Sequence, residues 1–160
     1  MDPFQIFGLQ IAMSFLTWGL LARWYVAPRL AAMPWPDALM PLLFVHAFRY
    51  VGMVFLVPTM VKSPLPPAFA DPVAYGDLAA SVLAFAAIFA VRARAGAAVP
   101  LAWIANVVGA VDLVNAYYRG LTLQPDVGAA YYIPAFIVPA LFVTHAMMFK
   151  MLLTRRPTPG

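Results

Sequence analysis

The chain has 160 residues, of which 64% are hydrophobic and only 10% are charged, and its formal net charge is +4. This composition leaves too little polar surface for a soluble globular domain of that size, so a lipid bilayer is its expected environment. Cysteine is absent, which excludes disulfides, thiolate catalysis and metal or iron–sulfur sites held by cysteine. The ten basic residues are spread in ones and twos along the chain, a pattern that does not indicate a nucleic-acid-binding protein.

Five apolar runs predict five membrane-spanning helices. Each run is near the roughly 20 residues that cross a hydrocarbon core about 30 Å thick. The N-terminal run lacks the basic residues and the cleavage site of a removable signal peptide, so we expect it to stay as a helix. The sequence therefore predicts an all-α integral membrane bundle that forms a single domain over residues 1–160. The predicted spans cover residues 4–22, 39–60, 73–91, 98–118 and 130–150.

The basic residues of the connections predict the orientation of the bundle. With five spans, the first connection, the third connection and the C-terminus share one side of the membrane. That side holds seven basic residues, whereas the opposite side holds two. Because cytoplasmic loops are enriched in Lys and Arg, we expect an outer N-terminus and a cytoplasmic C-terminus in a bacterial-type inner membrane. The seven are Arg23, Arg29, Arg92, Arg94, Lys150, Arg155 and Arg156, and the two are Lys62 and Arg119.

Two features bear on how the helices pack. Gly76, Ala80 and Ala84 recur at intervals of four in the third run, and such small residues let helix backbones approach closely in lipid. We expect this helix at the centre of the bundle or at a dimer contact. Pro134 and Pro139 lie within the fifth run. Because each proline removes a backbone hydrogen bond, this helix is predicted to be kinked.

Ionisable residues inside the membrane are costly and need partners. Arg49 falls near the middle of the second run, where an unpaired arginine costs about 2.5–3.5 kcal/mol. Asp112 in the fourth run lies at a similar depth, and we predict that it pairs with Arg49. Asn115 follows Asp112 by three residues on the same helix face and is expected to accept from the remaining guanidinium donors. Asp77 is interpreted as a first-turn anion of its helix, with a place at the mouth of a pathway as the alternative.

The two histidines, His46 and His145, fall at matching depths in the second and fifth runs. Three roles are open for them: hydrogen bonds between helices, a proton or ion relay, or ligation of a metal. The sharpest form of the last is a haem b held by both imidazoles, with Arg49 near a propionate and Gly52 or Gly109 leaving room for the ring.

We therefore expect a multi-pass membrane protein of the transporter or channel type. Its ligand would be a proton, an ion, an anion attracted to Arg49 or a lipid-like molecule. The alternatives are the haem protein and a structural or assembly subunit of a larger membrane complex, and a homo-oligomer is compatible with each. No enzyme is indicated, because phosphate-binding loops, zinc motifs and a mid-membrane lysine are missing from the sequence. The residues expected to bind or relay the ligand are His46, Arg49, Asp112, Asn115 and His145.

Overall fold

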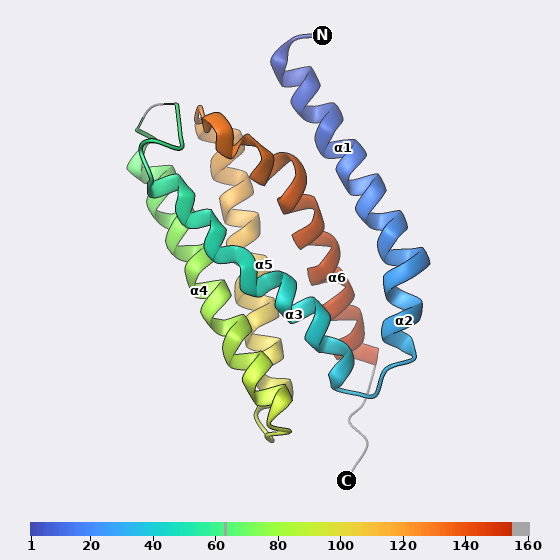
Figure 1. The fold of residues 1–160 in the computed structure, drawn as a ribbon. Coiled ribbons are helices and arrows are strands. Elements are labelled where there is room, and N and C mark those ends of the chain that lie inside the picture. Colours follow the sequence, from blue (N-terminus) through green and yellow to red (C-terminus); the bar gives the residue numbers. More distant parts are fainter. Residues whose placement is uncertain (63, 155–160) are drawn as a thin grey trace.

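The computed structural model describes residues 1–62 and 64–154, and within this part every regular element is a helix (Figure 1). Five helical stretches of the described residues are long and apolar enough to cross a membrane, which confirms the predicted number of candidate spans. Arg155 and Arg156, which contribute to the predicted orientation, lie outside the described residues. The five stretches are Pro3–Ala31, Asp37–Leu56, Pro67–Arg92, Ala98–Leu123 and Gly128–Thr154.

The first stretch is longer than predicted. It consists of α1 (Pro3–Leu21), the π-helical η1 (Ala22–Val26) and α2 (Ala27–Ala31). Pro28 cannot donate a backbone hydrogen bond, and the wider π turn immediately before it is a common way for a helix to continue past such a gap. Arg29, expected in a connection, therefore lies on the helix, where its guanidinium donates to the carbonyl oxygen of Tyr25 at 2.9 Å.

The second stretch changes its helical type near its middle. A short turn, η2 (Asp37–Leu39), leads into α3 (Met40–Ala47), which gives way to the tighter 3₁₀-helical η3 (Phe48–Leu56). At the junction, the Ser81 hydroxyl donates to the carbonyl oxygen of Ala47 at 2.6 Å. Runs of 3₁₀ helix longer than three or four residues are uncommon and often mark a functional hinge or local strain.

The third stretch, α4 (Pro67–Arg92), begins six residues earlier than predicted. Pro67 stands in the first turn, where the missing N–H has no intrahelical partner to lose. Pro72 lies further in, where its N–H would have bonded to the carbonyl oxygen of Ala68. That oxygen instead accepts from the guanidinium of Arg119 at 2.7 Å, so a side chain of another helix replaces the hydrogen bond that Pro72 removes.

The fourth stretch is longer than predicted, and the fifth changes its helical type along its length. α5 (Ala98–Leu123) continues past residue 118, so Arg119 lies on the helix and not in a loop. The fifth stretch consists of η4 (Gly128–Tyr131), the π-helical η5 (Ile133–Ile137) and α6 (Val138–Thr154). The helical type thus changes in the region of Pro134 and Pro139, where the sequence predicted a kink.

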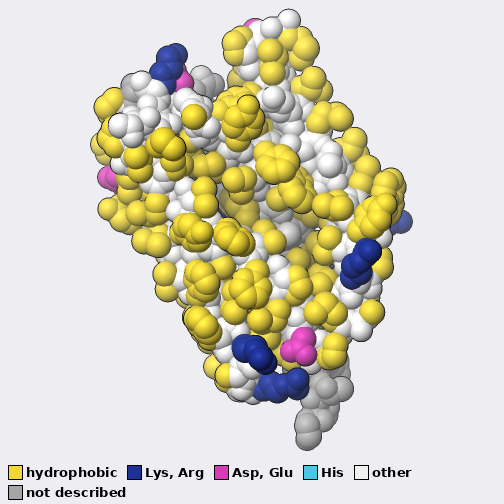
Figure 2. Space-filling model, viewed as in Figure 1, with side chains coloured by type: hydrophobic (Ala, Val, Ile, Leu, Met, Phe, Trp, Pro, Cys, Tyr) yellow, Lys and Arg dark blue, Asp and Glu magenta, His cyan; other side chains and the backbone are white. Residues whose placement is uncertain are grey.

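The third stretch packs closely against its neighbours, but it runs along one side of the bundle and not through the centre that the sequence predicted (Figure 1). Ala80 and Ala84 are buried, and α4 packs against α3, η3 and α5. In contrast, α1 has no buried residue and contacts α6 and η5 at the edge of the bundle (Figure 1). On the face that Figure 2 shows, hydrophobic side chains predominate, and the few charged side chains lie near the two ends and along the lateral edges.

Candidate functional site

The buried centre of the site is Arg49 on η3, whose side chain is fully shielded from solvent. Each guanidinium nitrogen makes a short contact. Nε donates to Oδ1 of Asp77 on α4 at 2.7 Å, and Nη2 donates to Oδ2 of Asp112 on α5 at 2.6 Å. Nη1 donates to the carbonyl oxygen of Gly109 at 2.7 Å. One cation is therefore held between two carboxylates that come from two different helices.

The predicted contact between Arg49 and Asp112 is confirmed, but the expected role of Asp77 is wrong. Because α4 starts at Pro67, Asp77 lies ten residues into the helix and cannot be a first-turn anion. Its carboxylate points into the bundle and completes the cluster, in which the side chains of Asp77 and Asp112 are 11% and 13% exposed. We call Arg49, Asp77 and Asp112 the ionic cluster.

Three glycines make room for the ionic cluster. A β-carbon added to Gly76 would lie 1.7 Å from Oδ1 of Asp112, and one added to Gly52 would lie 1.9 Å from Oδ2 of Asp77. At Gly109 it would meet both the imidazole of His145 at 2.9 Å and Nη1 of Arg49 at 3.1 Å. The carboxylates and the guanidinium thus rest directly on helix backbone, which is possible only where side chains are missing.

The two histidines meet each other beside this cluster, as their matching depths predicted. The imidazoles of His46 on α3 and His145 on α6 are buried, and their ring centroids are 3.9 Å apart with an interplanar angle of 34°. The approach of His145 to Gly109 brings the imidazole pair next to the guanidinium of Arg49. Polar side chains from α3, η3, α4, α5 and α6 therefore form one continuous polar core.

Two residues that the sequence analysis did not single out orient the imidazoles. Nδ1 of His145 lies 2.7 Å from Oδ1 of Asn106, an oxygen that can only accept, so Nδ1 carries the proton. Nε2 of His46 lies 3.2 Å from the hydroxyl of Thr144, which also lies 2.9 Å from the carbonyl oxygen of Ala140. Nδ1 of His46 and Nε2 of His145 have no hydrogen-bond partner among the described residues.

This geometry does not support a haem between the two histidines. Axial imidazoles point their nitrogens at one iron from opposite faces of the macrocycle. Here the two rings stack against each other and leave no gap for a flat group, so Gly52 and Gly109 serve the ionic cluster and not a ring. Among the described residues there is also no group of three or more metal-binding side chains.

Asn115, the remaining predicted site residue, lies outside the cluster. Its side-chain oxygen accepts from Nε of Arg119 at 3.1 Å, one helical turn further along α5. The expectation that Asn115 completes the shell of Arg49 is wrong, because a partner on its own helix at the favourable i,i+4 spacing takes its acceptor. Asn115 instead orients the arginine that bonds to the carbonyl oxygen of Ala68.

A cavity of about 600 Å³ opens beside the ionic cluster. Arg49 and Asp77 line its inner end, and they are the charged residues among its described lining. Pro3 of α1 and Gln124 after α5 line its other end, so the cavity extends from the middle of the bundle toward the end where the N-terminus lies (Figures 1 and 2). Its volume falls within the range of about 300–1,000 Å³ that is common for small-molecule sites.

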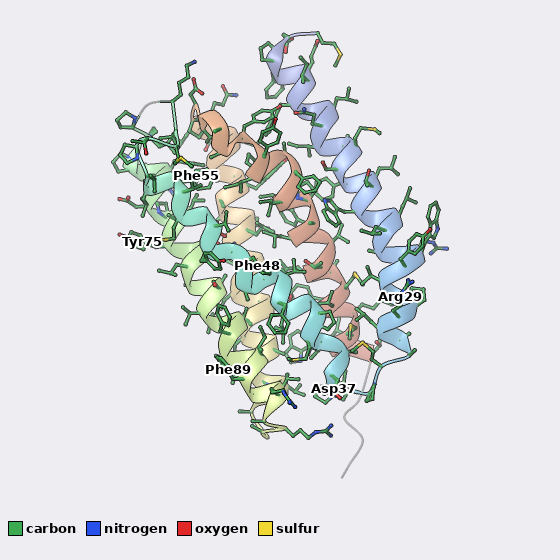
Figure 3. All side chains as sticks on the ribbon, in the orientation of Figure 1. Arg29, Asp37, Phe48, Phe55, Tyr75 and Phe89 are labelled. Atoms are coloured by element: carbon green, nitrogen blue, oxygen red, sulfur yellow. The ribbon has the colours of Figure 1, made fainter. Side chains whose placement is uncertain are left out.

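The wall of the cavity is mainly apolar and rich in aromatic side chains. Phe48 and Phe55 come from η3, and Figure 3 shows where they lie along it. The opposite wall includes Trp18 of α1, whose indole N–H donates to the carbonyl oxygen of Phe136 at 3.1 Å. An apolar chamber with one charged end is suited to a molecule that is itself largely apolar and carries one polar group.

Comparison with known families places the chain in one of them. A family model described as "Domain of unknown function (DUF8737)" matches residues 6–153, and the chain therefore belongs to this family. Neither the curated proteins nor the solved structures contain a match. The function is accordingly inferred from the contacts and charges of the site.

Proposed function

We propose that this chain is a transporter-like membrane protein in which the ionic cluster binds and releases a proton at the inner end of the cavity. The observation that carries the proposal is the arrangement of one fully buried arginine between two carboxylates. A structural ion pair needs one carboxylate for one arginine. The second carboxylate is a group that the packing of Arg49 does not require.

The charges of the cluster support a proton site. Counted with both histidines neutral, Arg49, Asp77 and Asp112 carry a formal charge of −1. An unbalanced charge in the hydrocarbon costs about 2.5–3.5 kcal/mol even on lenient scales, and two carboxylates that share one site do not ionise independently. A proton on one of the two carboxyl groups restores neutrality. The cluster is therefore suited to bind and release one proton.

The histidine pair supports movement of that proton. Neutral imidazole accepts a proton on one ring nitrogen and donates from the other, which is why histidines serve as shuttles. The buried Nε2 of His145 has no partner among the described residues and lies on the side of Gly109, whose carbonyl oxygen accepts from the guanidinium of Arg49. The proposed route leads from the cavity through Asp77 or Asp112 to His145 and His46.

The proposal includes an orientation and a location. The described end of the bundle that holds Arg92 and Arg94 is more basic than the end that holds Lys62. By the positive-inside rule the basic end faces the cytoplasm, in a bacterial-type inner membrane. The cavity then opens toward the outer side, at the end where α1 begins.

Infrared spectroscopy of the full chain in detergent tests the proton site. We expect a band of protonated carboxyl that disappears between mildly acidic and alkaline buffer, and that is weakened or shifted in Asp77→Asn and in Asp112→Asn. Both variants keep Arg49 paired with one carboxylate, so they are expected to fold. Asp71→Asn on the exposed face of α4 is the matched control and leaves the band unchanged.

Proteoliposomes test the transport. With a proton gradient imposed across the vesicle membrane, the wild-type chain is expected to carry protons. In Asp77→Asn and in Asp112→Asn the rate of proton transport is expected to be at least about tenfold lower than in the wild type. Asp71→Asn again serves as the control. The proposal is contradicted if the wild-type chain shows no titrating carboxyl band and no proton flux above that of empty vesicles.

A further inference from the structure

We infer that the cavity binds a lipophilic monocation, whose charge takes the place of the proton at the ionic cluster. This inference rests on the proposed function and names the class of molecule that the same site accepts. Its starting point is the position of the carboxylate of Asp77, which lines the cavity beside Arg49. A ligand that fills the cavity reaches this carboxylate at its inner end.

The sign of the ligand follows from the contacts of Arg49. Its Nε, Nη1 and Nη2 already donate to Asp77, to the backbone of Gly109 and to Asp112. An anion would add a second uncompensated negative charge to a cluster whose formal charge is already −1. A monocation instead neutralises the formal charge of −1, as a proton does. The cluster therefore selects against anions, although an arginine lines the cavity.

The apolar character of the ligand follows from the wall. Phe55 and Phe69, in edge contact with ring centroids 5.5 Å apart, line the cavity beside η3 and α4. Tyr117 of α5 and Phe136 of η5 line other parts of it. Aromatic faces attract a cation through their quadrupoles, most strongly where the cation has lost its water. A small hydrated ion would leave this wall unused, whereas a cation with aryl or alkyl substituents contacts it.

The place of α1 is consistent with entry from the membrane. Phe7 and Trp18 of α1 line the cavity, yet α1 has no buried residue and contacts the rest of the bundle mainly at α6 and η5. Figure 2 shows the hollow open between hydrophobic side chains on the face turned to the viewer. A lipophilic cation dissolved in the bilayer can therefore reach the cavity from the side.

The exchange of a cation for a proton has a defined pH dependence. The titratable groups around Asp77 are Arg49 on η3, Asp112 on α5, His46 on α3 and His145 on α6, with Tyr117 and Tyr131 on the wall of the cavity. If one proton leaves for each cation bound, the affinity for the cation rises as the pH rises. While the site is protonated, the increase is about tenfold for each pH unit.

Equilibrium binding of tetraphenylphosphonium to the full chain in detergent tests the inference. Tetraphenylborate, an anion of nearly the same size and shape, is the matched control ligand. We expect saturable binding of the cation, at least about tenfold tighter than that of the anion, with release of one proton in weakly buffered solution. Asp77→Asn removes one negative charge from the cluster and is expected to lower the affinity for tetraphenylphosphonium at least about tenfold. Asp71→Asn is expected to leave this affinity unchanged.

The outcomes separate the inference from the proposed function. Equal binding of the two ions, or cation binding without proton release, overturns the inference and leaves a proton site that the infrared titration still detects. A titrating carboxyl band without binding of tetraphenylphosphonium also overturns the inference and leaves the proton site. Loss of both the band and the binding overturns both proposals. Proton-linked binding that depends on Asp77 supports both.

Discussion

At the scale of single residues, the glycines next to the ionic cluster have a packing role that can be measured. Gly76 lies in α4 opposite the carboxylate of Asp112, and an added β-carbon would lie 1.7 Å from its Oδ1. Exchange of glycine for alanine within a helix normally stabilises it by up to about 1 kcal/mol. At Gly76 the clash reverses the sign, because the carboxylate can move only by giving up its contact with Arg49.

We predict that Gly76→Ala lowers the free energy of unfolding by about 1–3 kcal/mol, the usual cost of overpacking a filled core. Unfolding in mixed detergent, followed by circular dichroism, measures it. Gly19→Ala on α1 is the control, because nothing lies within 4 Å of the added β-carbon, and this variant is expected to be as stable as the wild type or slightly more so. Equal behaviour of the two variants would contradict the packing described for the cluster.

At the scale of elements, α4 and α5 are joined by a bond that compensates for a proline. Arg119 donates to the carbonyl oxygen of Ala68, which Pro72 leaves without its intrahelical donor. Ala68 is exposed, so the bond is expected to contribute about 0.5–1.5 kcal/mol, the usual net value of a protein hydrogen bond. The stability cost of removing Arg119 should therefore depend on the presence of Pro72.

A double-mutant cycle tests this dependence. We predict that Arg119→Gln destabilises the chain by about 0.5–1.5 kcal/mol, and that the same substitution costs clearly less in a Pro72→Ala background, where the backbone N–H of residue 72 can bond to Ala68. Thermal unfolding of the four proteins in one detergent gives the coupling. Costs that simply add would show that Arg119 does not act through this carbonyl.

The connections at the outer end of the proposed topology are joined by an exposed ion pair. Nζ of Lys62 lies 2.8 Å from Oδ2 of Asp126. The hydrogen bond from Lys62 lowers the pKa of Asp126 below its ordinary value of 3.8, and the same bond raises the pKa of Lys62 above 10.5. The pair is thus complete between these values. Its stabilisation is lost as the pH falls through the lowered pKa of Asp126 and as it rises through the raised pKa of Lys62.

Titration of the Lys62 amine by NMR checks this pair. In Asp126→Asn the pKa of Lys62 is expected to fall back toward 10.5, with little change in the stability of the chain, because exposed pairs are screened by water. Asp37→Asn, at the opposite end of the bundle (Figure 3), is the control and leaves the pKa of Lys62 unchanged. An unchanged pKa in Asp126→Asn would mean that the pair does not persist in solution.

Much of this arrangement could be predicted from helix boundaries and directions, and its errors arose from the same source. Arg49 and Asp112 were brought to one depth by counting residues along the second and fourth spans, which run in the same direction, and the contact is present. Asp77 was misassigned because the third span was begun at residue 73, whereas α4 begins at Pro67, a residue that a helix tolerates in its first turn. The i,i+4 partner of Asn115 was hidden because the fourth span was ended at residue 118.

At the scale of the whole molecule, the cavity could not be predicted from sequence. It depends on how far α1 lies from η3, and the hydrophobicity of α1 differs little from face to face, so no apolar face indicates which neighbour it prefers. Hydrophobicity gives no preference for helix over lipid within a bilayer. Polar contacts fix the position of α1 instead, and they include the hydrogen bond from Trp18 to Phe136 and that from the Tyr131 hydroxyl to Gln10.

The orientation of the whole chain decides from which side the cavity is reached, and the two ends of the bundle differ in their exposed basic residues. Arg119 was counted as a loop charge on the outer side, but its guanidinium is bonded to Asn115 and to the backbone of Ala68. Among the described basic residues, this leaves Lys62 as the exposed one at that end, and Asp126 partners it. The positive-inside rule therefore rests on the opposite end.

The absence of cysteine allows a direct test of this orientation, because a single introduced cysteine is the only thiol in the chain. We predict that Met60→Cys reacts with a membrane-impermeant maleimide in intact bacterial cells, since Met60 is 51% exposed at the end where the cavity opens. Ala95→Cys, in the exposed connection between α4 and α5, should react only after the membrane is permeabilised. The reverse pattern would place the basic end outside and the mouth of the cavity in the cytoplasm. Lipophilic cations would then be taken from the cytoplasmic side, and the proton would leave in the opposite direction.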